Sequence, residues 1–173
     1  MTPLLVRWLK DALLEVQEYV KLCVAVFRAV VTPPFYYKDV VEQFDQIGVK
    51  SLTVVLLTGL FTGAVLALQT GMTLDQFGAR SVVGRLVSAS MVKELGPVLT
   101  SLMVSGRVGS GIAAELGSMM VTEQISALRA LGTDPIRKLA VPRVLAGLIM
   151  VPILTVISGG IGMVGGWIVA VTQ

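Results

Sequence analysis

Apolar residues recur at helical spacing through the first part of the chain, with charged residues between them. Residues 4–31 place apolar side chains three or four positions apart, which is the spacing of one helix face. Such a helix lies in the plane of a membrane interface more readily than it spans, with packing on a soluble partner as the alternative. Pro33 and Pro34 end it, because proline cannot continue the hydrogen-bond ladder. The pattern predicts an interfacial amphipathic helix over a first domain, residues 1–34.

The remaining chain, residues 35–173, alternates long apolar runs with short polar segments. A membrane-spanning helix needs about 20 apolar residues. We therefore expect three spans, at about residues 51–74, 98–119 and 144–171. A short amphipathic segment, Val40–Ile47, leads through Gly48 to the first span, and a kink is expected at Pro97, where the second begins. The predicted fold class is an all-α integral membrane protein, with an interfacial helix followed by a transmembrane helix bundle.

A polar segment, residues 122–138, separates the second and third spans and has a helical pattern. Thr122 is a candidate N-cap, and Gly132 can end the helix. The six Lys and Arg before the first span and the four in residues 129–143 outnumber the two between the first and second spans. Because cytoplasmic segments are enriched in Lys and Arg, the N-terminus and this loop are predicted to be cytoplasmic, and the chain to end outside.

Composition narrows the possible functions. Of the 173 residues, 54% are hydrophobic and 14% are charged, which is typical of a membrane protein. The sequence has no His, one Cys and no GxxxxGK[ST] motif, which excludes His-based catalysis, a Cys/His zinc site and a P-loop. Glu94 and Glu115 would lie about 30 Å apart on a continuous helix, too far to act on one bond. If ATP hydrolysis drives this protein, the hydrolysis would therefore take place in a separate protein.

Small residues recur at four-residue spacing in two of the predicted spans, which predicts close helix packing. The first set is Gly59, Gly63, Ala67 and Gly71. In the second span two interleaved sets run together: Ser105, Gly109, Ala113 and Gly117, and Gly106, Ser110, Ala114 and Ser118.

Four charged residues fall within or beside the second span: Lys93, Glu94, Arg107 and Glu115. Charges inside a bilayer are costly and usually face a protein interior or a water-filled cavity. Arg107 and Glu115 lie about 12 Å apart along one side of the helix. The four residues either line a lipid cavity or gate, or form an internal ion-pair network that holds helices together.

The order of the motifs KELGP, GRVGSG, AELGS, TEQ and TDP resembles the MlaE-type permease family of lipid-transporting ABC systems, over roughly residues 40–170. The resemblance implies a non-enzymatic transport subunit in the bacterial inner membrane. It implies a homodimer, a separate ABC ATPase that binds ATP and Mg, and an MCE-domain partner. Together these would move phospholipid or related lipid between the inner membrane and the outer envelope.

The resemblance also implies roles for particular residues. The polar segment would be the ATPase-coupling helix, through Thr122, Glu123, Gln124, Leu128, Arg129 and Asp134, with Glu123 and Gln124 at the ATPase groove. The four charges of the second span would lie near the dimer cavity. The family usually has five spans, whereas this sequence ends at Gln173 after three, so the resemblance implies a partial permease or further spans supplied from elsewhere.

Two other functions compete with lipid transport. The polar loop and the three-span architecture also suit a non-transporting membrane scaffold that recruits cytoplasmic partners. The charges of the second span also suit an ion channel, although the sequence has no clear pore-lining ring. An intramembrane hydrolase is disfavoured, since no nucleophile has a base beside it.

Overall fold

The computed structural model describes residues 2–32 and 36–172, with side chains for residues 7–32, 36–79 and 81–172. Within these ranges the regular elements are helices, which confirms the expected all-α fold class. The α-helices are α1 (Thr2–Val31), α2 (Tyr37–Phe44), α3 (Lys50–Asp75), α4 (Val83–Ser90), α5 (Gly96–Val121), α6 (Gln124–Ala130) and α7 (Val141–Thr172). Short π-helical turns join some of them, at η1 (Asp45–Val49), η3 (Met91–Leu95) and η4 (Ile136–Ala140), and η2 (Arg80–Val82) is a 3₁₀ turn.

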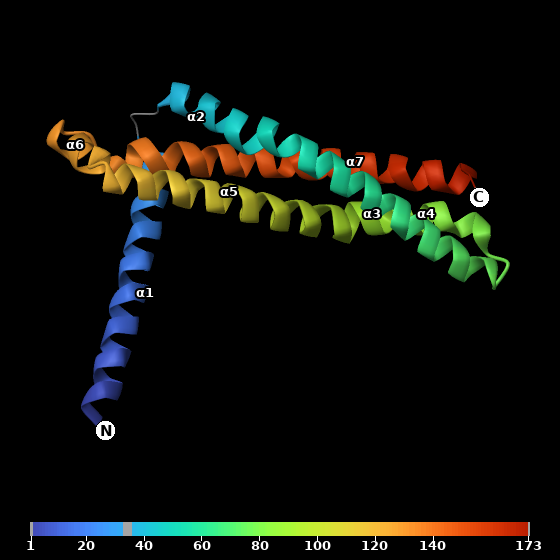
Figure 1. Ribbon diagram of the computed structural model, residues 1–173, viewed down its shortest axis with the longest axis horizontal. Coiled ribbons are helices and arrows are strands. Elements are labelled where there is room, and N and C mark those ends of the chain that lie inside the picture. The colour runs from blue at the N-terminus through green and yellow to red at the C-terminus, as the bar shows by residue number, and fades with distance from the viewer. Residues whose placement is uncertain (1, 33–35, 173) are drawn as a thin grey trace.

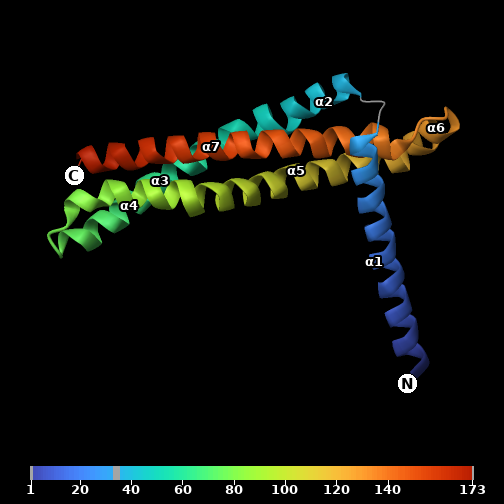
Figure 2. The same ribbon diagram turned by 180° about the vertical axis from the view of Figure 1, so that it is seen from behind.

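Three long helices, α3, α5 and α7, form the bundle (Figures 1 and 2). The first and last run in the same direction and α5 runs against them. Two continuous helices, Tyr37–Asp75 and Ile136–Thr172, are long and apolar enough to cross a membrane. At 26 residues α5 is about 39 Å long, enough to span as well. Arg107 and Glu115 lower the hydropathy of α5, so its crossing stays a prediction from length and position.

The tightest packing in the bundle is between α3 and α7, where glycines bring the two backbones together. A methyl group at Gly63 would overlap the backbone of Gly162, and one at Gly165 would overlap the carbonyl of Leu60. A methyl group at Gly59 would come within 2.9 Å of the carbonyl oxygen of Ser158. Side chains at these positions are therefore incompatible with the observed helix separation.

Apolar side chains fill the space on either side of this glycine contact. Toward the α6 end the buried cluster joins α3, α5, α7 and η1 through Ile47, Val55, Val104, Ala146 and Leu154. Toward the other end a second cluster brings in α4 and η3, through Ala67, Val83, Val87 and Met91.

Two π-helical turns connect short helices to long ones. At η1, α2 passes into α3, so the predicted amphipathic segment and the first span form one helix, Tyr37–Asp75. Near Pro97, where a kink is expected, η3 lies directly before α5, which begins with the proline in its first turn. Proline lacks an N–H and clashes with the carbonyl four residues earlier. A widened turn just before it accommodates the ring without ending the helix.

Helix α1 extends sideways from the bundle, at the end where α6 lies (Figure 1). It contacts the rest of the chain through η4 and the start of α7, and Ala29 is its buried residue among those whose side chains are described. Most of its other apolar side chains are exposed, including Trp8 at 72% and Phe27 at 75%. An apolar stripe that no protein covers and that crosses the bundle direction suits the predicted interfacial helix. The predicted domain boundary at residues 34/35 lies outside the described residues.

We expect Gly63→Ala to destabilise the bundle by about 1–3 kcal/mol, because the methyl group would push α3 away from α7. Gly147→Ala, on the partner helix α7, is the matched control, since a methyl group there meets nothing within 4 Å. Thermal unfolding of both variants in one detergent measures the difference. Equal stability of the two variants would contradict the close α3–α7 contact.

The interfacial position of α1 can be tested with the two tryptophans of the chain, Trp8 and Trp167. In a Trp167→Phe background Trp8 is the sole emitter. We expect its fluorescence in vesicles to be quenched by lipids brominated near the glycerol, and much less by lipids brominated at the chain ends, because an interfacial helix lies at headgroup depth. Strong quenching by aqueous acrylamide with none by either lipid would contradict the interfacial assignment.

Candidate functional site at the polar end of the bundle

The predicted coupling segment forms a short helix, α6, at the end of the bundle (Figure 1). Thr122 is not its N-cap, because the Thr122 hydroxyl donates to the carbonyl of Ser118 at 2.8 Å and so extends the end of α5. The N-cap position is taken by Glu123, which has a left-handed backbone at φ 57°. Gly132, at φ 75°, follows the helix, as predicted. A left-handed residue is therefore found on each side of α6.

The predicted coupling residues differ in exposure. Thr122, Glu123, Gln124 and Arg129 are exposed, and Leu128 is half-buried. Asp134 is exposed but engaged, because its Oδ1 accepts the backbone N–H of Ile136 at 3.0 Å. Its Oδ2 lies 3.7 Å from Nε of Arg137. The exposed part of the segment is therefore α6 itself, whereas Asp134 stabilises the start of η4.

Lys138 in η4 connects this segment to α2. Its Nζ lies 2.5 Å from Oδ2 of Asp39 and 4.6 Å from the centre of the Tyr36 ring. The side chains of Lys138 and Asp39 are 34% and 27% exposed, so the pair is partly shielded from water. The Lys138 ammonium, in contact with the Asp39 carboxylate and the Tyr36 ring, therefore connects η4 to the beginning of the Tyr37–Asp75 helix.

Arg143 and Glu115 form the most buried ion pair described, between α7 and α5. Their side chains are 8% and 35% exposed, and Nη2 lies 2.9 Å from Oε2. The second guanidinium nitrogen, Nη1, has no partner. Glu115 therefore belongs to an ion pair between helices, which is the second of the two roles considered for the charges of α5.

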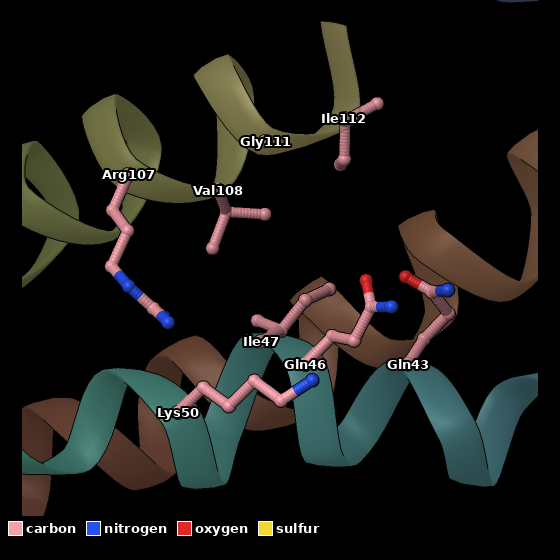
Figure 3. A pocket seen from close by; sticks show the side chains of 8 residues that line it. All are labelled: Gln43, Gln46, Ile47, Lys50, Arg107, Val108, Gly111 and Ile112. Carbon is pink, nitrogen blue, oxygen red and sulfur yellow. The ribbon is translucent and has the colours of Figure 1, made fainter. Parts of the chain in front are cut away.

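Arg107 lies two turns away on α5 and faces the helix Tyr37–Asp75. Its Nη1 donates to Oγ of Ser51 at 2.6 Å. Ser51 is only 2% exposed. Arg107 lines a cavity of about 190 Å³ together with Gln43, Gln46, Ile47, Lys50, Val108, Gly111 and Ile112 (Figure 3).

A second polar cavity, of about 210 Å³, adjoins the first and contains the ion pairs Glu115–Arg143 and Asp39–Lys138. Gln43 and Gln46 line both cavities. Arg107 and Glu115 thus lie in neighbouring cavities of one polar region, and each has a different partner.

Lys93 and Glu94 are not part of this region. Both lie in η3, about 20 Å from Arg107 along the helix, and both are exposed. In the described part of the chain neither forms a salt bridge with another residue. The structure therefore divides the four charges into Lys93–Glu94 at one level, and Arg107 and Glu115 at the polar end.

The two predicted small-residue faces have different surroundings. Gly59, Gly63 and Gly71 of α3 are buried. Gly106, Gly109 and Gly117 of α5 are exposed, and a methyl group on any of them would meet nothing within 4 Å. Within this chain the α5 face has no partner among the described residues.

Asp39, Lys138 and Arg143 complete the polar end, and sequence reasoning did not select them. Arg143 directly precedes the predicted third span, whereas Asp39 and Lys138 lie in polar segments several residues before a predicted span, so their residue types alone gave no signal. The available clue for Arg143 was the long charge-free run that follows it. In the described residues no three acidic or Cys side chains gather where they could hold a metal ion, so the arrangement suits ion pairing and binding.

Long apolar helices with most of their charges at one end define a helical membrane protein with a polar contact surface. Residues 40–173 match the sequence profile of the family described as Permease MlaE. The chain belongs to the MlaE permease family, which confirms the resemblance seen in its motifs.

The chain is also similar to curated proteins. It is 46% identical over 147 residues to a probable ABC transporter permease protein of Rickettsia bellii, covering 85% of this chain and 57% of that protein. It is 42% identical over 149 residues to the intermembrane phospholipid transport system permease protein MlaE of Haemophilus influenzae, covering 84% and 57%. It is 40% identical over 128 residues to the chloroplastic protein TRIGALACTOSYLDIACYLGLYCEROL 1 of Arabidopsis thaliana, covering 74% and 37%. The chain thus spans little more than half the length of the two bacterial relatives.

We expect Glu115→Gln to destabilise the protein by about 3 kcal/mol, because it leaves Arg143 buried without a counter-charge. The double variant Glu115→Leu/Arg143→Met should be less destabilised than the sum of its single variants, since removing both charges leaves none uncompensated. Asp45→Asn is the control, as its ion pair with Lys50 is more than half exposed and contributes at most about 1 kcal/mol. Unfolding in detergent compares Glu115→Gln, Glu115→Leu, Arg143→Met, the double variant and Asp45→Asn, and additive effects of the two single variants in the double variant would refute the pair.

Proposed function

We propose that this chain is the membrane-spanning permease subunit of an ATP-driven ABC transporter for phospholipid or a related lipid. It would move lipid between the inner membrane and the outer envelope. The observation that carries the proposal is the exposed helix α6, which projects from the end of the bundle (Figure 1). The ion pairs Glu115–Arg143 and Asp39–Lys138 join the long helices at this end of the bundle. ATP and Mg would bind to a separate ATPase seated on α6, because the sequence contains no P-loop motif.

The connections of α6 suit a coupling role. It follows α5 directly, through Thr122 and Glu123, and η4 leads from it into α7. The Lys138–Asp39 pair adds the Tyr37–Asp75 helix to the same assembly. A displacement of α6 by its partner would therefore be transmitted to all three long helices. Rigid-body rotation of packed helices is a common form of conformational change.

The lipid cargo and the further partners rest on the family. The Haemophilus influenzae relative is named for intermembrane phospholipid transport, and we extend that cargo class to this chain. The exposed glycine face of α5 is suited to a second copy of the chain, since small residues let helices approach closely. An MCE-domain protein would meet the assembly on the opposite side of the membrane.

We place the protein in the bacterial inner membrane, with its N-terminus and α6 in the cytoplasm. The excess of Lys and Arg before α3 and after α6 supports this orientation. The shared position of α1 and α6 at one end of the bundle is consistent with it (Figure 2).

The test is isolation of the tagged protein from its native membranes in mild detergent, followed by proteomics. We expect a P-loop ATPase and an MCE-domain protein to accompany the wild type. Glu123→Lys should reduce the ATPase at least tenfold, because the reversed charge lies on the proposed docking surface, while the spans stay folded. Glu18→Lys, the same exchange at an exposed site on α1, should retain both partners.

Undiminished recovery of the ATPase with Glu123→Lys would refute the coupling assignment. Recovery of neither partner by the wild type would favour the scaffold alternative. Lipid-stimulated ATP hydrolysis by the reconstituted complex would exclude that alternative.

A further inference from the structure

We propose that the cavity between α5 and the segment Gln43–Lys50 binds a phosphate group, with Arg107 and Lys50 as its cationic ligands. The phosphate would belong to a phospholipid headgroup or be free in solution. The inference adds a defined binding site to the proposed lipid-transport function and rests on that function for its physiological meaning. Binding itself is measurable without the ATPase.

The positive charge of Arg107 is not balanced by a described carboxylate. Its described partner is the hydroxyl of Ser51, at 2.6 Å from Nη1, and a hydroxyl carries no counter-charge. No carboxylate in the described part of the chain forms an ion pair with it. Three carboxylates line the adjoining cavity. Glu115 pairs with Arg143 and Asp39 with Lys138, and the third, Glu42, is exposed and forms no described ion pair with Arg107. An uncompensated guanidinium on a membrane helix favours an external anion.

The lining of the cavity favours an anion. Figure 3 shows Arg107 reaching from α5 toward the facing helix, which contributes Lys50, Gln46 and Gln43. Among the described residues no carboxylate lines the cavity. Asp45 lies 3.6 Å from the Lys50 ammonium, but both side chains are more than half exposed, so water weakens that pair. Lys50 is therefore available to a second anion.

Gln43 adds a buried polar group that lacks a partner. The residue is 8% exposed, and its Oε1 has no hydrogen-bond partner. A buried polar atom without a partner is costly. A half-turn of the terminal amide presents the NH₂ group instead, which donates to an anion. An occupant of this cavity would thus satisfy Gln43 as well as Arg107.

The depth of the cavity in the membrane also suits a lipid phosphate. Charged residues are frequent up to Lys50, and residues 51–74 contain none. As a helix this run is about 36 Å long, close to the hydrocarbon thickness of about 30 Å. Lys50 and the Ser51–Arg107 contact therefore lie at the edge of the hydrocarbon region, where lipid phosphates are found.

Access and chemistry also fit a phosphate. On the α5 side Gly111 lines the cavity between Val108 and Ile112, so that position contributes no side chain to the wall. A guanidinium offers paired N–H donors that match phosphate oxygens, and an ammonium adds a second positive charge.

The test is native mass spectrometry of the delipidated full chain, released from detergent with either dioleoylphosphatidic acid or dioleoylglycerol. The two lipids share their acyl chains and differ in the phosphate. We expect the wild type to bind phosphatidic acid at least tenfold more tightly than dioleoylglycerol. Arg107→Gln should lower the affinity for phosphatidic acid roughly tenfold, as expected for loss of charge-assisted hydrogen bonds. Lys50→Gln should lower it less, and Arg107→Lys should retain part of it.

Arg85→Gln is the matched control, because it removes one exposed positive charge near the far end of the bundle. It should leave phosphatidic acid binding unchanged, and none of the variants should alter dioleoylglycerol binding. Circular dichroism and gel filtration verify that each variant is folded. Equal affinity of the wild type for the two lipids, or equal losses in Arg107→Gln and Arg85→Gln, would overturn the proposal.

Millimolar inorganic phosphate distinguishes the two sources. Displacement of phosphatidic acid by inorganic phosphate would show a general phosphate site. An unchanged complex, with the preference over dioleoylglycerol intact, would assign the site to lipid headgroups. If phosphatidic acid binding is intact but the pull-down recovers no ATPase, the phosphate site is supported and the transport function is refuted. The two proposals can therefore fail separately.

Discussion

The structure depends on the close backbone contact between α3 and α7. In a membrane apolar side chains gain little by leaving lipid, so helices associate through packing and through polar contacts. Gly63 meets the backbone of Gly162 without an intervening side chain, and Gly59 lies against Ser158 and Ile161 of α7. That contact sets the helix separation against which α4, η3 and α5 then pack. A larger residue would alter the position of each of these elements relative to the others.

The same contact determines where the charged residues meet. Because α3 and α7 run in one direction, the polar residues that precede each of them come to the same end of the bundle. The end of α5 reaches that level from the opposite direction and brings Glu115 to Arg143. The ion pairs, the two polar cavities and α6 are thus consequences of one parallel pairing. Lys93 and Glu94 precede α5, and its opposite direction places them far from that end.

Periodicity and composition predicted the helical class, the approximate positions of the long helices and the polar segment between α5 and α7. They also identified the glycines of α3 that are buried against α7. The partners of the charges could not be predicted, since Arg107–Ser51 and Glu115–Arg143 join residues far apart in sequence through the register of three helices. The two glycine faces look alike in sequence, yet one is buried and the other is exposed. Only the identity of the neighbouring helix distinguishes them, and sequence spacing does not carry that information.

The π-helical turns at Asp45–Val49, Met91–Leu95 and Ile136–Ala140 each lie where a shorter helix or loop passes into a long one. A hydrogen bond from residue i to i+5 holds one residue more than an α-helical turn. Each extra residue rotates everything before it by about 100° relative to the helix that follows. Asp39 and Lys138, on two different helices, each precede or lie within such a turn, and they meet only with both rotations in place. The number of residues in these turns therefore determines the polar end as much as their identities do. Losing a single residue from either turn would separate Asp39 from Lys138 while leaving both of these side chains in the sequence.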